Sequence, residues 1–218
     1  MIQESHLRKI HLFRELESAE LARLIPVLKE RHAPKGSYIV YVDDPGPSIM
    51  FILEGKVKIT LVSSEGKEIV LAHLGEGDFF GEIALLTGED RSANVVASTD
   101  CTVLILASDD FKKHILERSG LALNLMRELA LRLRAASAKI GDLALYDVFE
   151  RVFRQLRSLA KPDPKTGVET IDDRPTHQEI SSMVGTSREM VSRALKNMEE
   201  DETIRVSGKR IEILRTEW

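Results

Sequence analysis

The sequence predicts an α+β protein with an antiparallel β-barrel in its first half, one long helix, and a winged helix-turn-helix at its C-terminal end. Three observations support this fold class. Short β-rich runs, separated by glycines or by Pro/Asp clusters, follow one another between residues 34 and 106. A heptad pattern of apolar residues then extends over residues 122–143. Two short amphipathic helices and a hairpin signal occupy residues 176–213.

The composition excludes several classes of protein. The chain has 218 residues, a net charge of −4 and one cysteine. No apolar run is long enough to span a membrane, and the N-terminus shows no basic segment followed by an apolar stretch, so we expect a cytoplasmic protein without a secretory signal. One cysteine cannot form an internal disulfide or hold an iron–sulfur cluster. The slightly acidic balance argues against coating nucleic acid through bulk positive charge.

The first half is expected to combine a helical start with a run of strands. Apolar residues recur at roughly helical spacing through residues 5–31, with Ser18 as a plausible N-cap. The expected strands are Tyr38–Val42, Ile49–Leu53, Val57–Val62, Ile69–Leu74, Ala93–Val96 and Cys101–Leu106. Ser108 is expected to cap a further helix that runs through Phe111 to Leu116.

A long helix is predicted after Gly120. Its apolar seam consists of Ala122, Met126, Leu129, Leu133, Ala136, Ile140 and Leu143, a pattern that predicts pairing with a second helix. The alternative is a helix packed on its own domain, and Leu121 and Leu125 lie off the seam where they could make such a contact. Asp147 is expected to cap the next helix, which precedes a loop at residues 161–167. The predicted domains are therefore 1–119, 120–146 and 147–218.

The C-terminal motif is typical of a DNA-reading domain. Thr176 and Glu179 form a capping box, Gly185 makes a tight turn, and Ser187 caps a second helix from Arg188 to about Glu200. One arc of that helix carries Arg188, Glu189, Ser192, Arg193 and Lys196, and the opposite arc is apolar. Arginine pairs with guanine and glutamate accepts from cytosine, so this arc could read a G·C-containing half-site. The alternative is a merely solvated face, which the order of helix, turn and wing makes less attractive.

The hairpin that follows has a basic tip around Lys209, which suits phosphate contacts.

The first half carries a phosphate-binding pattern. Gly81 allows the backbone to enter a single helical turn whose free N–H groups at Ile83 and Ala84 can face an anion. Arg91 offers a planar pair of donors for phosphate oxygens and Ser92 offers a hydroxyl. Glu82 fits such a site if it accepts a hydrogen bond from a sugar hydroxyl. The alternative is an ordinary ion pair between Glu82 and Arg91 at the barrel rim.

These two motifs, Gly81–Leu85 with Arg91–Ala93 and Gln178–Arg193, resemble the cyclic-AMP receptor (catabolite activator) branch of the Crp/Fnr family of transcription regulators. The resemblance covers nearly the whole chain and implies a cyclic-nucleotide-binding β-roll (a double-stranded β-barrel), a dimerisation helix and a winged helix-turn-helix. It implies that Glu82 takes the ribose 2′-hydroxyl, and that Arg91, Ser92 and the Ile83 amide take the cyclic phosphate. In the DNA-reading half, Arg188, Glu189 and Arg193 would contact base edges, and Thr176, Gln178 and Ser187 would contact phosphates.

The resemblance also concerns the long helix. In the family, two hydroxyl residues of this helix close the ligand pocket, and here those positions read Ala136 and Ser137. Ser137 is well placed to reach the partner's ligand, whereas Ala136 lacks the hydroxyl expected to contact the adenine edge. Arg132 could pair with Glu82 when ligand is present. The oxygen-sensing branch needs a cysteine cluster that the sequence lacks, and a lone His73 or Cys101 is a poor basis for haem binding.

The sequence thus predicts a homodimeric, non-enzymatic transcription regulator that responds to a cyclic nucleotide, cAMP first, and binds palindromic double-stranded DNA. Ligand is expected to shift an equilibrium toward an arrangement with the two recognition helices about 34 Å apart. No metal, haem or iron–sulfur cofactor is expected. Contact with RNA polymerase is expected from the family, with residues 161–167 as a candidate surface.

Three alternatives remain open. The same fold could sense cyclic GMP or a cyclic dinucleotide, or act without ligand. The chain could be an enzyme on a cyclic phosphodiester, with Glu82 as base and Arg91 as electrophile, although no metal-ligand cluster accompanies them. Finally, it could regulate another protein without touching DNA.

Overall fold

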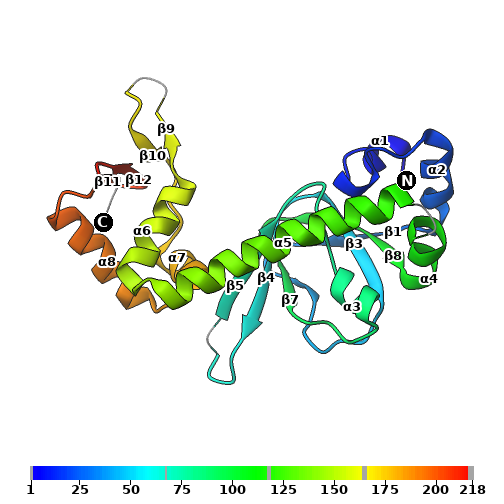
Figure 1. Ribbon diagram of the computed structural model, residues 1–218, viewed down its shortest axis with the longest axis horizontal. Helices are drawn as coiled ribbons and strands as arrows, with labels where there is room; N and C mark the ends of the chain where they lie inside the picture. The colour runs from blue at the N-terminus through cyan, green and yellow to red at the C-terminus, as the bar shows by residue number, and fades with distance from the viewer. Residues whose placement is uncertain (1, 67, 117–118, 164–165, 216–218) are drawn as a thin grey trace. The chain divides into compact units, whose positions relative to one another are not determined.

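The computed structural model describes residues 2–66, 68–116, 119–163 and 166–215. The chain divides into two compact units, Met1–Arg132 and Leu133–Trp218, and the division falls within the long helix α5 (Ser119–Leu145) (Figure 1). The predicted division into three domains stays a prediction, because a division into two compact units does not show whether residues 120–146 form a separate dimerisation helix.

The first unit is built on two four-stranded antiparallel sheets, which confirms the predicted β-roll. One sheet has the order β1-β8-β3-β6 and the other β2-β7-β4-β5. Their strands are β1 (Lys29–Ala33), β2 (Tyr38–Val40), β3 (Ser48–Glu54), β4 (Val57–Val62), β5 (Glu68–Leu74), β6 (Phe79–Phe80), β7 (Asn94–Ala97) and β8 (Cys101–Ala107). The six expected strands agree with β2–β5, β7 and β8 to within two residues at each end.

Strand β3 lies between two hydrophobic clusters, which explains its continuous apolar sequence. Met50 and Ile52 belong to the cluster formed with side chains of both sheets. Ile49, Phe51 and Leu53 point the opposite way, into a cluster shared with the N-terminal helices and with Leu121 and Leu125 of α5. Because alternate residues of a strand face opposite sides, a strand buried on both faces reads as an uninterrupted apolar run.

The prediction of a helical region over residues 5–31 is wrong in two respects: the segment is not continuously helical, and its last residues belong to a strand. The segment folds as α1 (Glu4–Leu7), η1 (His11–Phe13), α2 (Ser18–Leu24), η2 (Ile25–Val27) and then strand β1. The apolar spacing that suggested one helical region reflects burial of Leu7, Phe13, Leu21 and their neighbours beneath short separate turns. The expected cap is displaced by one residue, since Glu17 is the N-cap of α2 and forms a capping box with Glu20.

The helix expected after Ser108 is also irregular. Ala107 occupies the N-cap position, and Ser108 is the first residue of α4 (Ser108–Phe111). The helix then widens into a π-helical segment, η3 (Lys112–Leu116).

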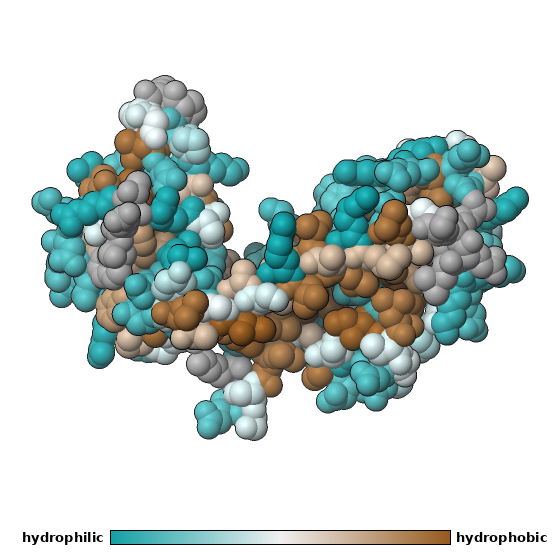
Figure 2. Space-filling model, viewed as in Figure 1, coloured by the Kyte–Doolittle hydropathy of each residue, from teal (hydrophilic) through white to brown (hydrophobic). Residues whose placement is uncertain are grey.

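Helix α5 confirms the predicted long helix and spans 27 residues. Leu121 and Leu125, which lie off the seam, are buried in the core of the first unit, as expected for residues that pack on the helix's own domain. Several seam residues are exposed instead. Among them, Met126, Leu133 and Ile140 have 58%, 69% and 67% of their surface accessible to solvent. Apolar surface is visible along the course of α5 in Figure 2. None of the helices in the described part of the chain is both long and apolar enough to cross a membrane.

The second unit packs three helices on a small antiparallel sheet. Its elements are α6 (Val148–Leu159), β9 (Lys161–Pro162), β10 (Glu169–Ile171), α7 (His177–Val184), α8 (Arg188–Glu200), β11 (Ile204–Ser207) and β12 (Arg210–Ile213). The sheet order is β11-β12-β10-β9, and its own core includes Phe153, Ile180 and Met198. Asp147 caps α6 as predicted. The segment 161–167, expected as a loop, begins as strand β9, which pairs with β10; residues 164 and 165 lie outside the described residues.

Candidate ligand cradle and DNA-reading surface

The conformation of Gly81 determines the local geometry of the phosphate-binding pattern. Strand β6 ends at Phe80, and Gly81 has a φ of +83° where it caps helix α3 (Glu82–Thr87). A Cβ at this position would lie 2.5 Å from Nη1 of Arg91 and 2.8 Å from the Ser48 carbonyl oxygen. Only glycine therefore combines the left-handed backbone with this close approach.

The Arg91 side chain lies against that glycine and is almost fully buried. Its Nη1 donates to the carbonyl oxygens of Ser48 at 2.8 Å and Gly81 at 3.2 Å, and its Nη2 donates to Ser48 Oγ at 2.7 Å. Burial lowers the pKa of Arg91, and the negative charges of Asp44 and Glu82 oppose that effect. The guanidinium is thus a fixed cation, since arginine remains protonated at neutral pH even when burial lowers its pKa.

Glu82 is buried too, and its ion pair is made with Arg132 of α5. The distance from Arg132 Nη1 to Glu82 Oε1 is 2.9 Å. Nη2 of Arg132 donates to the Phe79 carbonyl oxygen at 2.6 Å, and the guanidinium lies 4.3 Å from the centroid of the Phe79 ring. The structure therefore pairs Glu82 with Arg132, the partner expected when ligand is present, and not with Arg91 as in the alternative of a rim ion pair. We call Ser48, Gly81, Glu82, Arg91 and Arg132 the α3 cradle.

The other predicted ligand residues differ in exposure. Ala84 is a buried residue of α3, whereas Ile83 is 48% exposed and Ser92 is exposed. Ser137 is exposed on the part of α5 that belongs to the second unit. The structure therefore brings Gly81, Glu82, Arg91 and Arg132 together within the first unit.

Sequence reasoning missed Ser48 and Phe79 as parts of the cradle. Ser48 acts through its carbonyl oxygen as well as its hydroxyl, and a backbone acceptor leaves no trace in the side-chain pattern. Phe79 precedes the glycine motif, but its contact with Arg132 joins residues 53 positions apart. Only the buried apolar pair Phe79–Phe80 beside Gly81 offered a signal.

The helix-turn-helix is fixed by the local interactions that the sequence predicts. The Thr176 hydroxyl oxygen accepts from the Glu179 N–H, and the Glu179 side chain accepts from the Thr176 N–H at 2.7 Å, which completes the capping box of α7. Gly185 ends α7 with a φ of +71°. The Ser187 hydroxyl oxygen then accepts from the Met190 N–H at the start of α8. Two helices are thereby held on either side of a short turn.

Helix α8 separates a buried and an exposed face as predicted. Val191, Ala194, Leu195 and Met198 are buried, whereas Arg188, Glu189, Arg193 and Lys196 are exposed. Hydrogen bonds from its own backbone N–H and from the Ser187 hydroxyl lower the pKa of Glu189, so it is a carboxylate acceptor at neutral pH. The exposed face thus offers two arginines and an acceptor at its N-terminal end.

A cavity of about 500 Å³ lies beside this face. It is lined by Arg174, Pro175, Thr176, His177, Gln178, Arg188 and Lys209. The structure therefore gathers four of the predicted DNA-contacting residues, Thr176, Gln178, Arg188 and Lys209, around one concave and basic surface. Arg174 and His177 are additional members of this surface, which sequence reasoning missed because their places beside Arg188 and Lys209 depend on contacts between separate elements.

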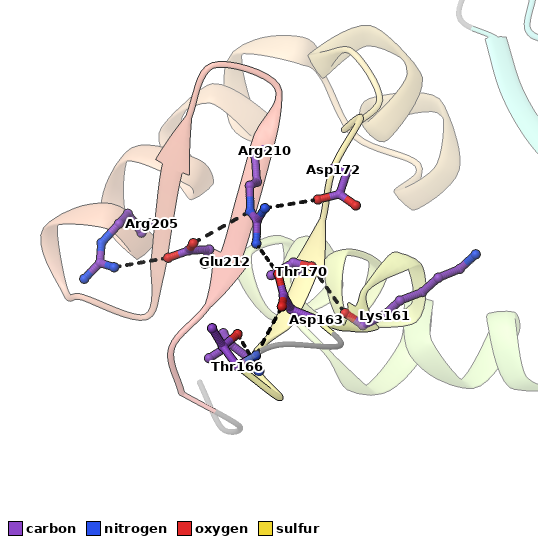
Figure 3. A network of polar contacts seen from close by, with 9 residues as sticks. Lys161, Asp163, Thr166, Thr170, Asp172, Arg205, Arg210 and Glu212 are labelled. Carbon is purple, nitrogen blue, oxygen red and sulfur yellow. Dashed lines mark hydrogen bonds and ion pairs between the residues drawn. The ribbon is translucent and has the colours of Figure 1, made fainter.

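The wing is tied to the β9–β10 hairpin by a polar network. Arg210 of β12 donates from Nη2 to Asp163 Oδ2 at 2.7 Å, and its Nη1 lies 3.6 Å from Asp172 Oδ1. Arg205 of β11 pairs with Glu212 Oε2 at 3.1 Å. Figure 3 shows Arg210 pointing from the wing strand toward the Asp163 end of the hairpin. Asp163 also accepts from the Thr166 N–H at 3.2 Å, so one carboxylate organises the hairpin end and the wing together.

Comparison with known proteins gives a consistent result. Residues 30–118 match the model of the cyclic nucleotide-binding domain, and residues 150–217 match that of the Crp-like helix-turn-helix domain. The chain is 36% identical over 201 residues to the cAMP-activated global transcriptional regulator Vfr of Pseudomonas aeruginosa, covering 90% of this chain and 94% of that one. It is 36% identical over 185 residues to the cAMP-activated global transcriptional regulator CRP of Salmonella typhimurium, covering 84% and 88%.

Solved structures of similar proteins agree. The Thermus thermophilus catabolite activator protein superimposes with a TM-score of 0.55 at 32% identity, over 93% of this chain and 92% of that chain. The c-di-GMP responsive global regulator CLP of Xanthomonas campestris gives a TM-score of 0.74 at 24% identity, over 92% and 100%. The latter likeness concerns the fold alone.

Proposed function

Because the chain belongs to the Crp/Fnr family of transcription regulators, we propose that it is a homodimer whose effector is cAMP and whose target is palindromic DNA. The chain is a cyclic-nucleotide-binding transcription regulator and not an enzyme, as its relatives are transcription regulators. Its helix-turn-helix domain indicates DNA binding. A protein that reads chromosomal DNA in bacteria acts in the cytoplasm.

The observation that carries the effector proposal is the geometry of the α3 cradle. A buried, fixed guanidinium at Arg91 lies beside the glycine that opens α3, and a buried carboxylate at Glu82 lies on the same short helix. A cyclic phosphate and an adjacent ribose hydroxyl require this combination of a cation and an acceptor. Ser92 and the Ile83 N–H complete the proposed set of phosphate donors.

Calorimetry tests this proposal. Titration with cAMP, cyclic GMP and cyclic di-GMP is compared for the wild-type protein, Arg91→Ala, and Arg14→Ala as a control that removes an exposed arginine. We expect cAMP binding that Arg91→Ala abolishes and Arg14→Ala retains. Binding of another nucleotide in place of cAMP would assign that effector to the cradle, and Ala136 is the residue that motivates this second candidate, because it lacks a hydroxyl for the adenine edge.

The DNA proposal rests on the exposed face of α8. Arg188, Glu189 and Arg193 are proposed to read base edges, whereas Thr176, Gln178, Ser187, Lys196 and Lys209 are proposed to contact or face phosphates. Selection from a randomised duplex library should return a two-fold symmetric site with a guanine in each half. Arg188→Ala and Arg193→Ala should each weaken binding to that site by about 1–3 kcal/mol while leaving binding to scrambled DNA nearly unchanged.

Dimerisation is proposed to use the exposed seam of α5. Met126, Leu133, Ile140 and Leu143 are apolar residues in heptad positions that water would otherwise surround. Sedimentation of Ile140→Asp should show a shift to monomer, because one buried carboxylate per helix opposes the pairing. Leu131→Asp makes the same chemical change at an exposed position off the seam and should remain dimeric.

Contact with RNA polymerase is proposed for the β9–β10 hairpin. Lys161 and Pro162 are exposed there, and Asp163 holds the hairpin to the wing. Lys161→Glu should lower activated transcription in a reconstituted assay while DNA affinity stays at the wild-type value. An equal loss of DNA affinity would assign the hairpin to DNA contact instead.

A further inference from the structure

The imidazole of His177 connects two elements of the DNA-reading unit. Its Nδ1 lies 2.8 Å from Ser192 Oγ on α8, and its Nε2 lies 2.9 Å from Nη1 of Arg174. An arginine nitrogen can only donate a hydrogen bond. Nε2 must therefore accept, so the imidazole is neutral, carries its proton on Nδ1 and donates that proton to Ser192.

Arg174 extends this connection to the turn of the wing. Its Nε donates to the Gly208 carbonyl oxygen at 3.3 Å, and its backbone N–H donates to the Lys209 carbonyl oxygen at 2.9 Å. A continuous path of hydrogen bonds thus runs from the wing turn through Arg174 and His177 to Ser192. Ser192 is only partly exposed and lies on α8 within the arc that carries Arg188 and Arg193.

We propose that neutral His177 is a positioning residue that holds the wing turn and helix α8 in the relative position needed to read DNA. Protonation at Nε2 disrupts this relative position. The proposal rests on the DNA-binding function above and adds a residue and a pH dependence to it. A protonated Nε2 has no lone pair for Arg174, and it would place two cations within hydrogen-bonding distance. Arg174 would then leave His177, and the wing turn would lose its tie to α8.

The charges around His177 favour the neutral form. Arg174 precedes α7, Arg188 begins α8, and Lys209 lies on the wing turn, all three lining the same cavity. Of the acidic groups, Glu179 on α7 accepts hydrogen bonds from Thr176, and Asp173 pairs with Lys209 at 3.0 Å. Partial burial lowers the pKa of His177, and Arg174 and Arg188 lower it further.

The proposal and plain electrostatics predict opposite responses to acid. A protein that only gains positive charge near phosphates should bind every duplex more tightly as the pH falls. Loss of the hydrogen-bonded connection should instead weaken binding to the specific site and leave scrambled DNA bound as well or better. The ratio of the affinity for the specific site to the affinity for scrambled DNA therefore distinguishes the proposal from plain electrostatics.

Fluorescence anisotropy at constant ionic strength measures this ratio between pH 7.5 and 5.5. The probes are a duplex selected from a random library at pH 7.5 and its scrambled counterpart, with full-length protein and cAMP. The wild-type ratio should fall severalfold over this range, by less than the tenfold that a complete loss of one hydrogen bond to a charged group would give, because the lowered pKa leaves part of the His177 population neutral at pH 5.5. His177→Gln keeps one acceptor and one donor without a titratable proton, so its ratio should stay constant. His177→Arg is always charged and should show the low ratio even at pH 7.5.

Two results would overturn the proposal. If His177→Arg binds the selected duplex more tightly than wild type and wild type tightens in acid, His177 is a phosphate contact and not a positioning residue. If all three proteins share one pH slope, His177 does not contribute to it. A separate measurement, ¹⁵N NMR of the imidazole in the free protein, should show the Nδ1–H tautomer. That measurement tests the connection even if no duplex is selectively bound, the outcome that would instead contradict the DNA-binding proposal.

Discussion

Replacement of Gly81 by alanine provides a sharp test of the α3 cradle, because the chain contains a matched control. Gly81 and Gly88 flank α3 with nearly equal φ values, +83° and +77°. A Cβ on Gly88 meets nothing within 4 Å, whereas a Cβ on Gly81 would lie 2.5 Å from Arg91 Nη1 and 2.8 Å from the Ser48 carbonyl oxygen. The two alanine variants share the backbone strain, and only Gly81→Ala adds the collision.

The size of the effect follows from these contacts. An alanine in the left-handed region costs about 1–2 kcal/mol, which is the whole expected cost of Gly88→Ala. Gly81→Ala must also displace Arg91 Nη1 from two carbonyl acceptors, and each hydrogen bond to a charged group contributes about 1.5–3 kcal/mol. Partial relaxation leaves an expected difference of roughly 2–4 kcal/mol between the two variants. For a unit of 132 residues, this difference lowers the Tm by about 7–14 °C.

Differential scanning calorimetry measures the transition of the first unit in both variants, and isothermal titration measures their binding of cAMP. Gly88→Ala should bind the nucleotide like wild type, whereas Gly81→Ala should bind none, because its Arg91 is displaced. The reasoning is wrong if the two variants melt together, or if Gly81→Ala retains the wild-type affinity.

Three further perturbations test the remaining polar contacts. Arg132→Ala should destabilise the first unit by about 2 kcal/mol in urea unfolding, because the buried Glu82 carboxylate loses this partner; in a Glu82→Gln background the same change should cost clearly less, and strict additivity would contradict the pairing. Asp163→Asn should destabilise the second unit in urea unfolding, because Arg210 loses the carboxylate that it contacts at 2.7 Å, and high salt should diminish the difference. The lowered pKa of His177 means that the unfolded chain binds more protons, so the stability of the second unit should fall as the pH drops below about 6.5. Urea unfolding at pH 7.5 and 5.5 should show a smaller pH effect for His177→Gln, and an equal one would refute the assignment.

The elements that were predictable from sequence are those fixed by neighbours along the chain. The capping box of Thr176 and Glu179, the cap at Ser187 and the turn at Gly185 each depend on residues within four positions. The long helix was predictable because its apolar period persists over many turns. Strands β2–β5, β7 and β8 were predictable because glycines and Pro/Asp clusters mark their ends, whereas the two-residue strand β6 was missed.

The elements that were missed depend on distant partners. Strand β1 has four exposed residues in succession and is a strand because it pairs with β8, whose partner residues lie 68 to 76 positions away. Strand β9 has two residues and exists through its pairing with β10. In the cradle, the sequence indicated Gly81, Glu82 and Arg91, but the acceptors of Arg91 are partly carbonyl oxygens, which every residue possesses. His177 was missed for a similar reason, since its role depends on Arg174 and Ser192 meeting it in space.

The separate hydrophobic cores also bear on how such a protein can change over generations. In the described part of the chain, the second unit's core draws on residues between 152 and 213, and the cores of the first unit draw on residues between 7 and 125. Substitutions in the α3 cradle therefore lower the folding stability of the first unit, whereas the DNA-reading helices are stabilised by the separate core of the second unit. The effector specificity can therefore change during evolution while the DNA target sites stay the same. Equally, the DNA target sites can change while the effector specificity stays the same.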